Sequence, residues 1–117
     1  MNDGIVAQKS YDFAIRVVKL YKYLSKEHNE YVLSKQILRS GTAIGALIRE
    51  AKFAQSKADF ISKMSIALKE ANETHYWIDL LHDTEYINNN MYLNIEKDIN
   101  EIVSLLVSIV KSSKNNS

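Results

Sequence analysis

The sequence contains no cysteine and no proline, and only three of its 117 residues are glycine. The absence of cysteine excludes disulfide bonds and thiolate metal sites, and it fits a reducing compartment. Because proline is absent and glycine is rare, breaks between elements must come from clusters of polar residues. Long uncharged apolar runs are also absent, since the longest candidate, residues 40–48, is bounded by Arg39 and Arg49. We therefore expect no membrane-spanning segment.

Charge is balanced overall but unevenly distributed, with a formal net charge of +1. Up to Lys69 there are twelve Lys and Arg against six Asp and Glu, a balance of +6. From Glu70 onward there are three Lys and Arg against eight Asp and Glu, a balance of −5. A basic first half indicates either a nucleic-acid-binding face or complementary pairing between helices, within or between subunits. No basic start precedes an apolar run at the N-terminus, so we expect no signal peptide and a cytoplasmic location.

Three polar clusters, at residues 28–30, 55–56 and 88–90, divide the chain into four segments of helical length. Between the clusters, apolar residues recur at steps of three and four, the period of an amphipathic helix. Strand patterns are weak throughout. We therefore predict helices over residues 5–26, over residues 31–53, from Ser56 onward, and over residues 91–111.

The short links between these segments favour antiparallel neighbours. We predict an all-α, up-down-up-down four-helix bundle as one domain over residues 1–111, with a disordered tail over residues 112–117. Ser56 is the expected N-cap of the third helix, with Asp59 in the position of a capping box, and Asn90 is the expected cap of the fourth. The predicted core residues are Leu33, Ile37, Ile44, Phe60, Met64, Ile95 and Ile102.

The second and third segments carry more apolar and small side chains than one core can bury. Gly45 and Ala46 lie opposite the apolar stripe of the second segment, where a solvent-facing strip normally carries long polar residues. Ile66, Trp77 and Leu80 lie away from the main stripe of the third segment. A monomeric bundle needs one apolar stripe per helix, so the surplus predicts an oligomer. The expected subunit interface comprises Arg39, Gly45, Ala46, Ile66, Glu70, Glu73, Trp77 and Leu80.

Arg39 lies among the small residues of the second segment, while Glu70 and Glu73 lie beside the extra apolar strip of the third. A guanidinium that leaves water needs a carboxylate partner. We expect Arg39 to form a partly buried ion pair with Glu70 or Glu73 that fixes the register of helices or subunits. The alternative is an ordinary solvated arginine.

The first segment carries a basic face on the side opposite its apolar stripe, made by Arg16, Lys19, Lys22, Tyr23 and Lys26. Lysine and arginine neutralise phosphates, and a tyrosine ring stacks on bases, so we predict that this face binds RNA or DNA. In a ring of subunits the face would repeat, and multivalency would strengthen weak contacts. The alternative is a solvated face with no ligand.

His75, Asp79, His82 and Asp83 follow one another at helical steps, a pattern that can hold a metal ion. However, two histidines seven residues apart stand about 10 Å apart along a helix. No other segment offers a Glu-x-x-His partner, and the di-iron pattern of helical bundles needs four inward glutamates. We therefore expect no metal site and no cofactor. The chain also has no phosphate-binding glycine loop, no serine in a nucleophile elbow, and no Arg–His pair at the spacing of four-helix ribonucleases. We expect no enzymatic activity.

The chain resembles the four helix bundle protein family in five blocks, at residues 36–46, 50–51, 54–60, 66–74 and 77–81. Genes of this family include those in intervening sequences of bacterial 23S rRNA genes, and its members are often labelled ribosomal proteins. The resemblance implies a homopentamer of four-helix protomers. It also implies kinship with the accessory variability proteins of retroelements, which bind nucleic acid and a reverse transcriptase through a basic surface. Many relatives carry Asn where this chain has Leu47, so a polar contact that they make there would be missing.

These features together predict a bacterial, cytoplasmic, non-enzymatic helical scaffold that assembles with itself, as a pentamer by the resemblance, and binds RNA or DNA through its basic face. The alternative is a protein–protein assembly module without direct contact to nucleic acid. Its partner would be a protein such as a reverse transcriptase or a toxin-system component. Binding to nucleic acid that weakens with salt would favour the first interpretation.

Overall fold

The computed structural model describes residues 2–116, which form four α-helices and no strand. The helices are α1 (Asn2–His28), α2 (Leu33–Lys52), α3 (Lys57–Asp83) and α4 (Asn89–Asn115). They form an elongated bundle of 47 × 22 × 19 Å. The predicted all-α class and the predicted number of helices are confirmed. No helix within the described residues has the length and apolar character needed to cross a membrane.

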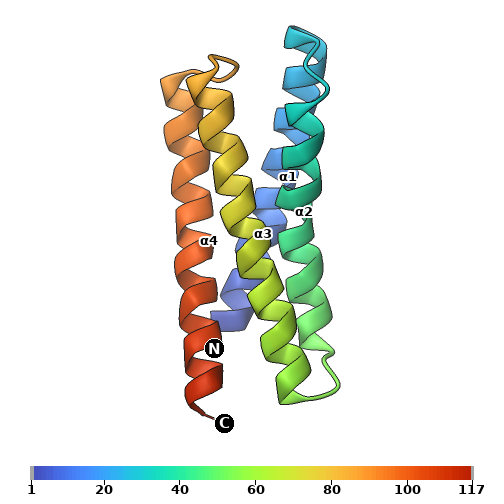
Figure 1. Ribbon diagram of the computed structural model, residues 1–117, viewed down its shortest axis with the longest axis vertical. Coiled ribbons are helices and arrows are strands. Elements are labelled where there is room, and N and C mark those ends of the chain that lie inside the picture. Colours follow the sequence, from blue (N-terminus) through green and yellow to red (C-terminus); the bar gives the residue numbers. More distant parts are fainter. Residues whose placement is uncertain (1, 117) are drawn as a thin grey trace.

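Each helix packs against two others, since α1 and α3 each contact both α2 and α4. In Figure 1, the α1–α2 and α3–α4 connections lie at one end of the bundle and the α2–α3 connection lies at the other. Helix α1 runs obliquely behind the other helices, beside α2 at its C-terminal end and near α4 at its N-terminal end (Figure 1). This course matters for function, because α1 lines two grooves on the bundle surface.

A buried carboxylate caps the start of α2. The side chain of Glu30 accepts hydrogen bonds from the backbone N–H groups of Val32, Leu33 and Ser34, at 3.1, 3.0 and 2.7 Å. Burial alone would raise the pKa of Glu30, but these backbone donors outweigh it and hold that pKa below its ordinary value. Glu30 lies in a polar cluster that indicated only a break between helices, so this cap was not predicted.

The N-caps of α3 and α4 are a serine and an asparagine. Ser56 Oγ accepts a hydrogen bond from the Asp59 N–H at 3.0 Å, which confirms the predicted cap of α3. Asn88 caps α4 by accepting from the Met91 N–H at 2.9 Å, so the prediction of Asn90 was wrong by two residues. Three consecutive asparagines satisfy the sequence rule equally well, and the extended backbone at Asn88 decides between them.

The C-terminal end of α4 also differs from the prediction. The helix continues to Asn115, past the boundary expected at Lys111. No glycine or proline interrupts the intervening serines and lysine, so the backbone hydrogen-bond pattern can propagate through them. Residues 112–115 therefore belong to the helix, and the predicted disordered tail is corrected to that extent.

The hydrophobic core lies between the four helices. Leu33 and Phe60, two of the seven predicted core residues, are half-buried against it. The other five are fully enclosed, namely Ile37, Ile44, Met64, Ile95 and Ile102.

Helix α2 packs closely against both of its neighbours. A Cβ atom added at Gly41 would lie only 2.8 Å from Val17 Cγ2, so this glycine allows α1 to approach α2. On the other side, the Thr74 hydroxyl of α3 forms a buried hydrogen bond of 2.9 Å with Ser40 Oγ. Buried hydroxyls need such partners, and this one links α2 to α3 in the interior.

Candidate functional site

An ion-pair network joins α2 to α3 on the bundle surface. Arg39 Nη1 lies 3.2 Å from Glu70 Oε1, and the same guanidinium also contacts Glu73. The Trp77 indole N–H donates to Glu73 Oε2 at 3.0 Å. Both carboxylates that were expected as partners therefore contact Arg39, within one protomer. The Arg39 side chain is 51% exposed, so the protomer alone leaves this network at the surface.

Three further residues of the expected subunit interface lie on α3, the helix of Glu70 and Glu73. Ile66 is 41% exposed, and Tyr76, whose ring contacts Trp77, is 59% exposed. Trp77 and Leu80 are half-buried, and Trp77 packs partly against its own core. The structure thus places an exposed apolar strip of α3 beside Arg39. Whether this strip contacts another subunit stays a prediction.

Gly45 and Ala46 line a separate, largely apolar groove between α1, α2 and the start of α3. Small side chains of α1, including Ala7 and Ala14, form the facing wall. A Cβ added at Gly45 would meet its nearest atom only at 3.4 Å, which leaves room that Gly41 does not have. We refer to this feature as the apolar groove.

The expected nucleic-acid-binding residues lie along one side of α1, and three of them are exposed cations: Lys19, Lys22 and Lys26. Arg16 instead forms an ion pair with Asp98 of α4, although its side chain remains 44% exposed. One of the four predicted cations is therefore partly neutralised within the protomer.

A second groove, which we call the basic groove, lies between α1 and the N-terminal half of α4. Arg16, Lys19 and Tyr23 line one wall. Three asparagines, residues 88, 90 and 94, line the other, and apolar side chains of both helices lie between the walls. From the sequence, the first two asparagines indicated a break between helices and, at Asn90, a helix cap, but no groove wall. Their place opposite the lysine depends on how α4 packs against α1, which no local pattern indicates.

The Tyr23 ring is held by the bundle rather than free in solvent. It is half-buried, and its hydroxyl lies 3.1 Å from His28 Nε2. The two rings meet edge to face, with centroids 5.2 Å apart. Tyr23 can therefore form part of the groove wall, but its freedom to stack on a base is restricted.

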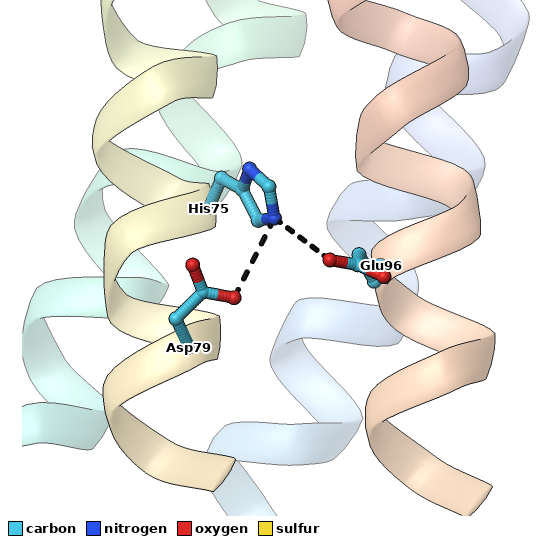
Figure 2. A group of neighbouring side chains, drawn as sticks. All are labelled: His75, Asp79 and Glu96. Atoms are coloured by element: carbon cyan, nitrogen blue, oxygen red, sulfur yellow. Dashed lines mark hydrogen bonds and ion pairs between the residues drawn. The ribbon is translucent and has the colours of Figure 1, made fainter. Parts of the chain in front are cut away.

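A polar cluster links α3 to α4. Figure 2 shows His75 and Asp79 on α3 facing Glu96 on α4. His75 Nε2 lies 3.1 Å from Glu96 Oε2 and 3.5 Å from Asp79 Oδ1. Tyr92 Oη lies 2.7 Å from the same Glu96 oxygen and 2.8 Å from the same Asp79 oxygen. Two carboxylates, one imidazole and one phenol thus meet at one point.

The hydrogen bonds of this cluster perturb two of its groups. Hydrogen bonds to Glu96 and then Asp79 raise the pKa of Tyr92 well above its ordinary value. The Tyr92 hydroxyl, followed by His75, holds the pKa of Glu96 below its ordinary value. Tyr92 therefore stays a neutral hydroxyl, whose one hydrogen can be donated to either carboxylate.

Helical spacing grouped four residues of α3 as possible metal ligands, but in the structure they have different partners. His75 and Asp79 face α4, whereas the His82 ring stacks on Tyr92, with centroids 4.2 Å apart. Asp83 Oδ1 instead lies 3.3 Å from His82 Nδ1. Glu96 was missed because it lies on another helix, and its distance from His75 depends on the packing of α3 against α4.

Comparison with known proteins agrees with this fold. The sequence model of the 23S rRNA-intervening sequence protein family matches residues 2–108. Among solved structures, a protein of unknown function from the S23 ribosomal protein family of Bacteroides thetaiotaomicron is 60% identical, with a TM-score of 0.93. The similarity covers 95% of this chain and 99% of that chain. No curated protein matches the sequence. The chain belongs to the 23S rRNA-intervening sequence protein family.

Proposed function

We propose that this protein is a non-enzymatic scaffold of the bacterial cytoplasm that assembles with itself, as a pentamer, and binds nucleic acid in the basic groove. The observation that carries the proposal is the composition of that groove. One wall supplies the cations Arg16 and Lys19, and the other supplies three asparagine amides. Cations attract the phosphate backbone, and amides both donate and accept hydrogen bonds at base edges or sugars.

The surrounding surface supports the same role. Lys22 and Lys26 continue the basic face of α1 beyond the groove and are exposed. Four cations on one protomer give only weak, salt-sensitive binding. A pentamer would present the groove five times, and simultaneous contacts along one strand would raise the apparent affinity.

Two observations support self-assembly. The apolar strip of α3 exposes Ile66 and Tyr76, and the apolar groove is lined by small side chains such as Ala46. The strip lies on α3 with the glutamates that contact the exposed Arg39, and the apolar groove lies between α1, α2 and the start of α3. A second copy that covered them would remove apolar area from water and bury the network.

RNA is the favoured ligand. The family is described by an intervening sequence of 23S rRNA, and the solved relative is assigned to the S23 ribosomal protein family. These descriptions apply to the relatives, and for this chain they favour RNA over DNA as the first ligand to test.

The test is a titration of the purified protein with labelled single-stranded RNA and duplex DNA at about 50 and about 200 mM salt. We expect binding to RNA with a Kd of about 1–100 μM that weakens as salt rises. The variant Lys19/Lys22/Lys26→Glu should lose at least about tenfold in affinity. A matched variant, Lys35/Lys69/Lys111→Glu, changes the charge equally at exposed positions on the other helices and should lose much less. Equal losses in both variants would contradict a specific basic face.

A protein partner is the second candidate function, and the apolar groove is the observation that favours it. A scaffold for a polymerase or a toxin-system component would need an apolar docking surface and no phosphate contacts. Absence of RNA or DNA binding at the lower salt concentration would favour this alternative. Light scattering tests self-assembly separately, with an expected mass five times the protomer mass of 13.4 kDa.

A further inference from the structure

We propose that His75, Asp79 and Glu96 form a binding site for a divalent transition metal ion such as Zn²⁺, which would tie α3 to α4. The site lies on the α3–α4 side of the bundle, away from the basic groove residues of α1. None of its three residues lines the basic groove, but Ile95, the residue before Glu96, does, so the two features adjoin on α4.

The spacing of the ligand atoms fits a metal ion. One nitrogen and two carboxylate oxygens, one from each residue, all lie within 4.8 Å of one another. Zinc bonds of about 2.0–2.2 Å place neighbouring ligands of a tetrahedron about 3.3–3.6 Å apart. The distances from His75 Nε2 to Glu96 and Asp79, 3.1 and 3.5 Å, are close to that spacing. The third pair of ligand atoms, from Asp79 and Glu96, lies within 4.8 Å, so binding requires side-chain rotation to bring all three to the spacing of a bound ion.

The three ligands come from rigid elements. His75 and Asp79 are four residues apart on α3, so they lie on one face of the helix, and Glu96 faces them from the interior of α4. All three positions lie inside their helices, with Asp79 four residues before the end of α3. A metal site needs such support, because its geometry must exist before the ion arrives.

Tyr92 and His82 form the surroundings that a metal site requires. The Tyr92 hydroxyl contacts one oxygen of each ligand carboxylate and so orients both toward His75. The His82 ring stacks on the Tyr92 ring and limits its motion. Hydrogen bonds of this kind to ligand carboxylates are typical of metal sites and improve their affinity.

The donor set and exposure indicate the class of ion. An imidazole nitrogen with two carboxylate oxygens suits Zn²⁺, Co²⁺ or Ni²⁺, whereas Mg²⁺ and Ca²⁺ prefer oxygen ligands alone. The side chains of His75, Asp79 and Glu96 are 31, 47 and 27% exposed. The ion can therefore enter from solvent and keep water in its remaining coordination positions.

The experiment is a titration of the full chain with Co²⁺, followed by visible absorption, and with Zn²⁺, followed by calorimetry. We expect one ion per protomer and a visible cobalt band of the kind given by a low-coordinate N/O site. Glu96→Gln and His75→Ala should each weaken binding at least about 100-fold, more than loss of a supporting hydrogen bond costs. Asp83→Asn and His28→Ala are matched controls, because they remove a carboxylate and an imidazole outside the cluster, and they should bind as the parent does.

Two results would overturn the assignment. One is the absence of heat and of a cobalt band at millimolar metal, which would leave an ordinary cluster of charged hydrogen bonds. The other is unchanged affinity in both ligand variants, which would place the ion elsewhere. Circular dichroism checks that each variant is folded. If His75→Ala unfolds, Glu96→Gln still decides, since its half-exposed side chain tolerates an amide of the same shape.

Discussion

The α2–α3 side of the bundle and the α1–α4 side use similar polar side chains with different results. Between α2 and α3, the buried Ser40–Thr74 hydrogen bond lies in the interior, and Arg39 pairs with two glutamates at the surface. These two helices are therefore linked both in the core and at the surface.

Between α1 and α4, ion pairs also cross from one helix to the other. Arg16 contacts Asp98, and Lys9 Nζ lies 2.9 Å from Glu101. A groove nevertheless remains beside Arg16. Surface ion pairs contribute little to helix packing, so they do not close a gap that the backbone leaves open.

The difference teaches that binding surfaces on this bundle come from the course of α1 and not from charge alone. Helix α1 approaches α2 at both glycines, since the Val17 side chain lies against Gly41 and the Ser10 backbone lies near Gly45. Its oblique path leaves the apolar groove toward α2 and α3 and the basic groove toward α4 (Figure 1). Four substitutions, two of them compared as a pair, test this view in order of expected effect.

The largest effect is expected for Arg39→Ala. If the α3 strip is covered by another subunit, as we propose, loss of the arginine leaves two buried carboxylates unpaired and costs about 3–5 kcal/mol of unfolding free energy. Urea unfolding measures this loss of free energy, and light scattering at the same protein concentration measures the state of assembly. A loss below about 1 kcal/mol would instead indicate a network that stays exposed in solution, as in the protomer.

The two glycines of α2 should respond to alanine in opposite directions. At Gly41 the new methyl group meets the stiff, branched Val17, and such overpacking costs about 1–3 kcal/mol. At Gly45 the nearest atom is 3.4 Å away, so the better helix propensity of alanine should dominate and stabilise by up to about 1 kcal/mol. Thermal melting of the pair measures both. Equal effects would contradict the difference in room for a methyl group at the two positions.

A smaller, pH-dependent effect is expected for Glu30→Gln, at the joint from which α1 turns into α2. Loss of the charged cap should cost about 0.5–2 kcal/mol at neutral pH. Because the pKa of Glu30 is depressed in the folded state, its contribution is present above the ordinary value of 4.5 and is lost as pH falls through the folded value. The unfolding free energies of parent and variant should therefore converge in acid. A constant difference between pH 7 and pH 3 would show that the charge plays no part.

Local sequence patterns predicted much of the fold because helices depend on local chemistry. The period of the apolar residues located four helices, and Ser56 with Asp59 marked the start of α3. The pairing of Arg39 with Glu70 and Glu73 followed from residue types that need partners. Where local rules were degenerate, prediction failed, as with the asparagines that could each cap α4.

The candidate sites could be predicted only in part. The lysines of the basic face were identified, since one helix face contains them all. The asparagine wall of the basic groove and the approach of Glu96 to His75 were not, because each joins residues of two helices. The spacing of residues in the sequence describes one helix at a time and does not indicate the register of one helix against another.

The sequence by itself determined the helices, their apolar stripes and the distribution of charge, because backbone hydrogen bonds and side-chain period are properties of consecutive residues. Tertiary structure alone decided which surfaces became grooves and which polar groups meet, such as Tyr92 with Asp79. The physical reason is that helix crossing and register follow from how all the core side chains pack at once. A single close contact, that of Val17 at Gly41, helps to set the path of a whole helix.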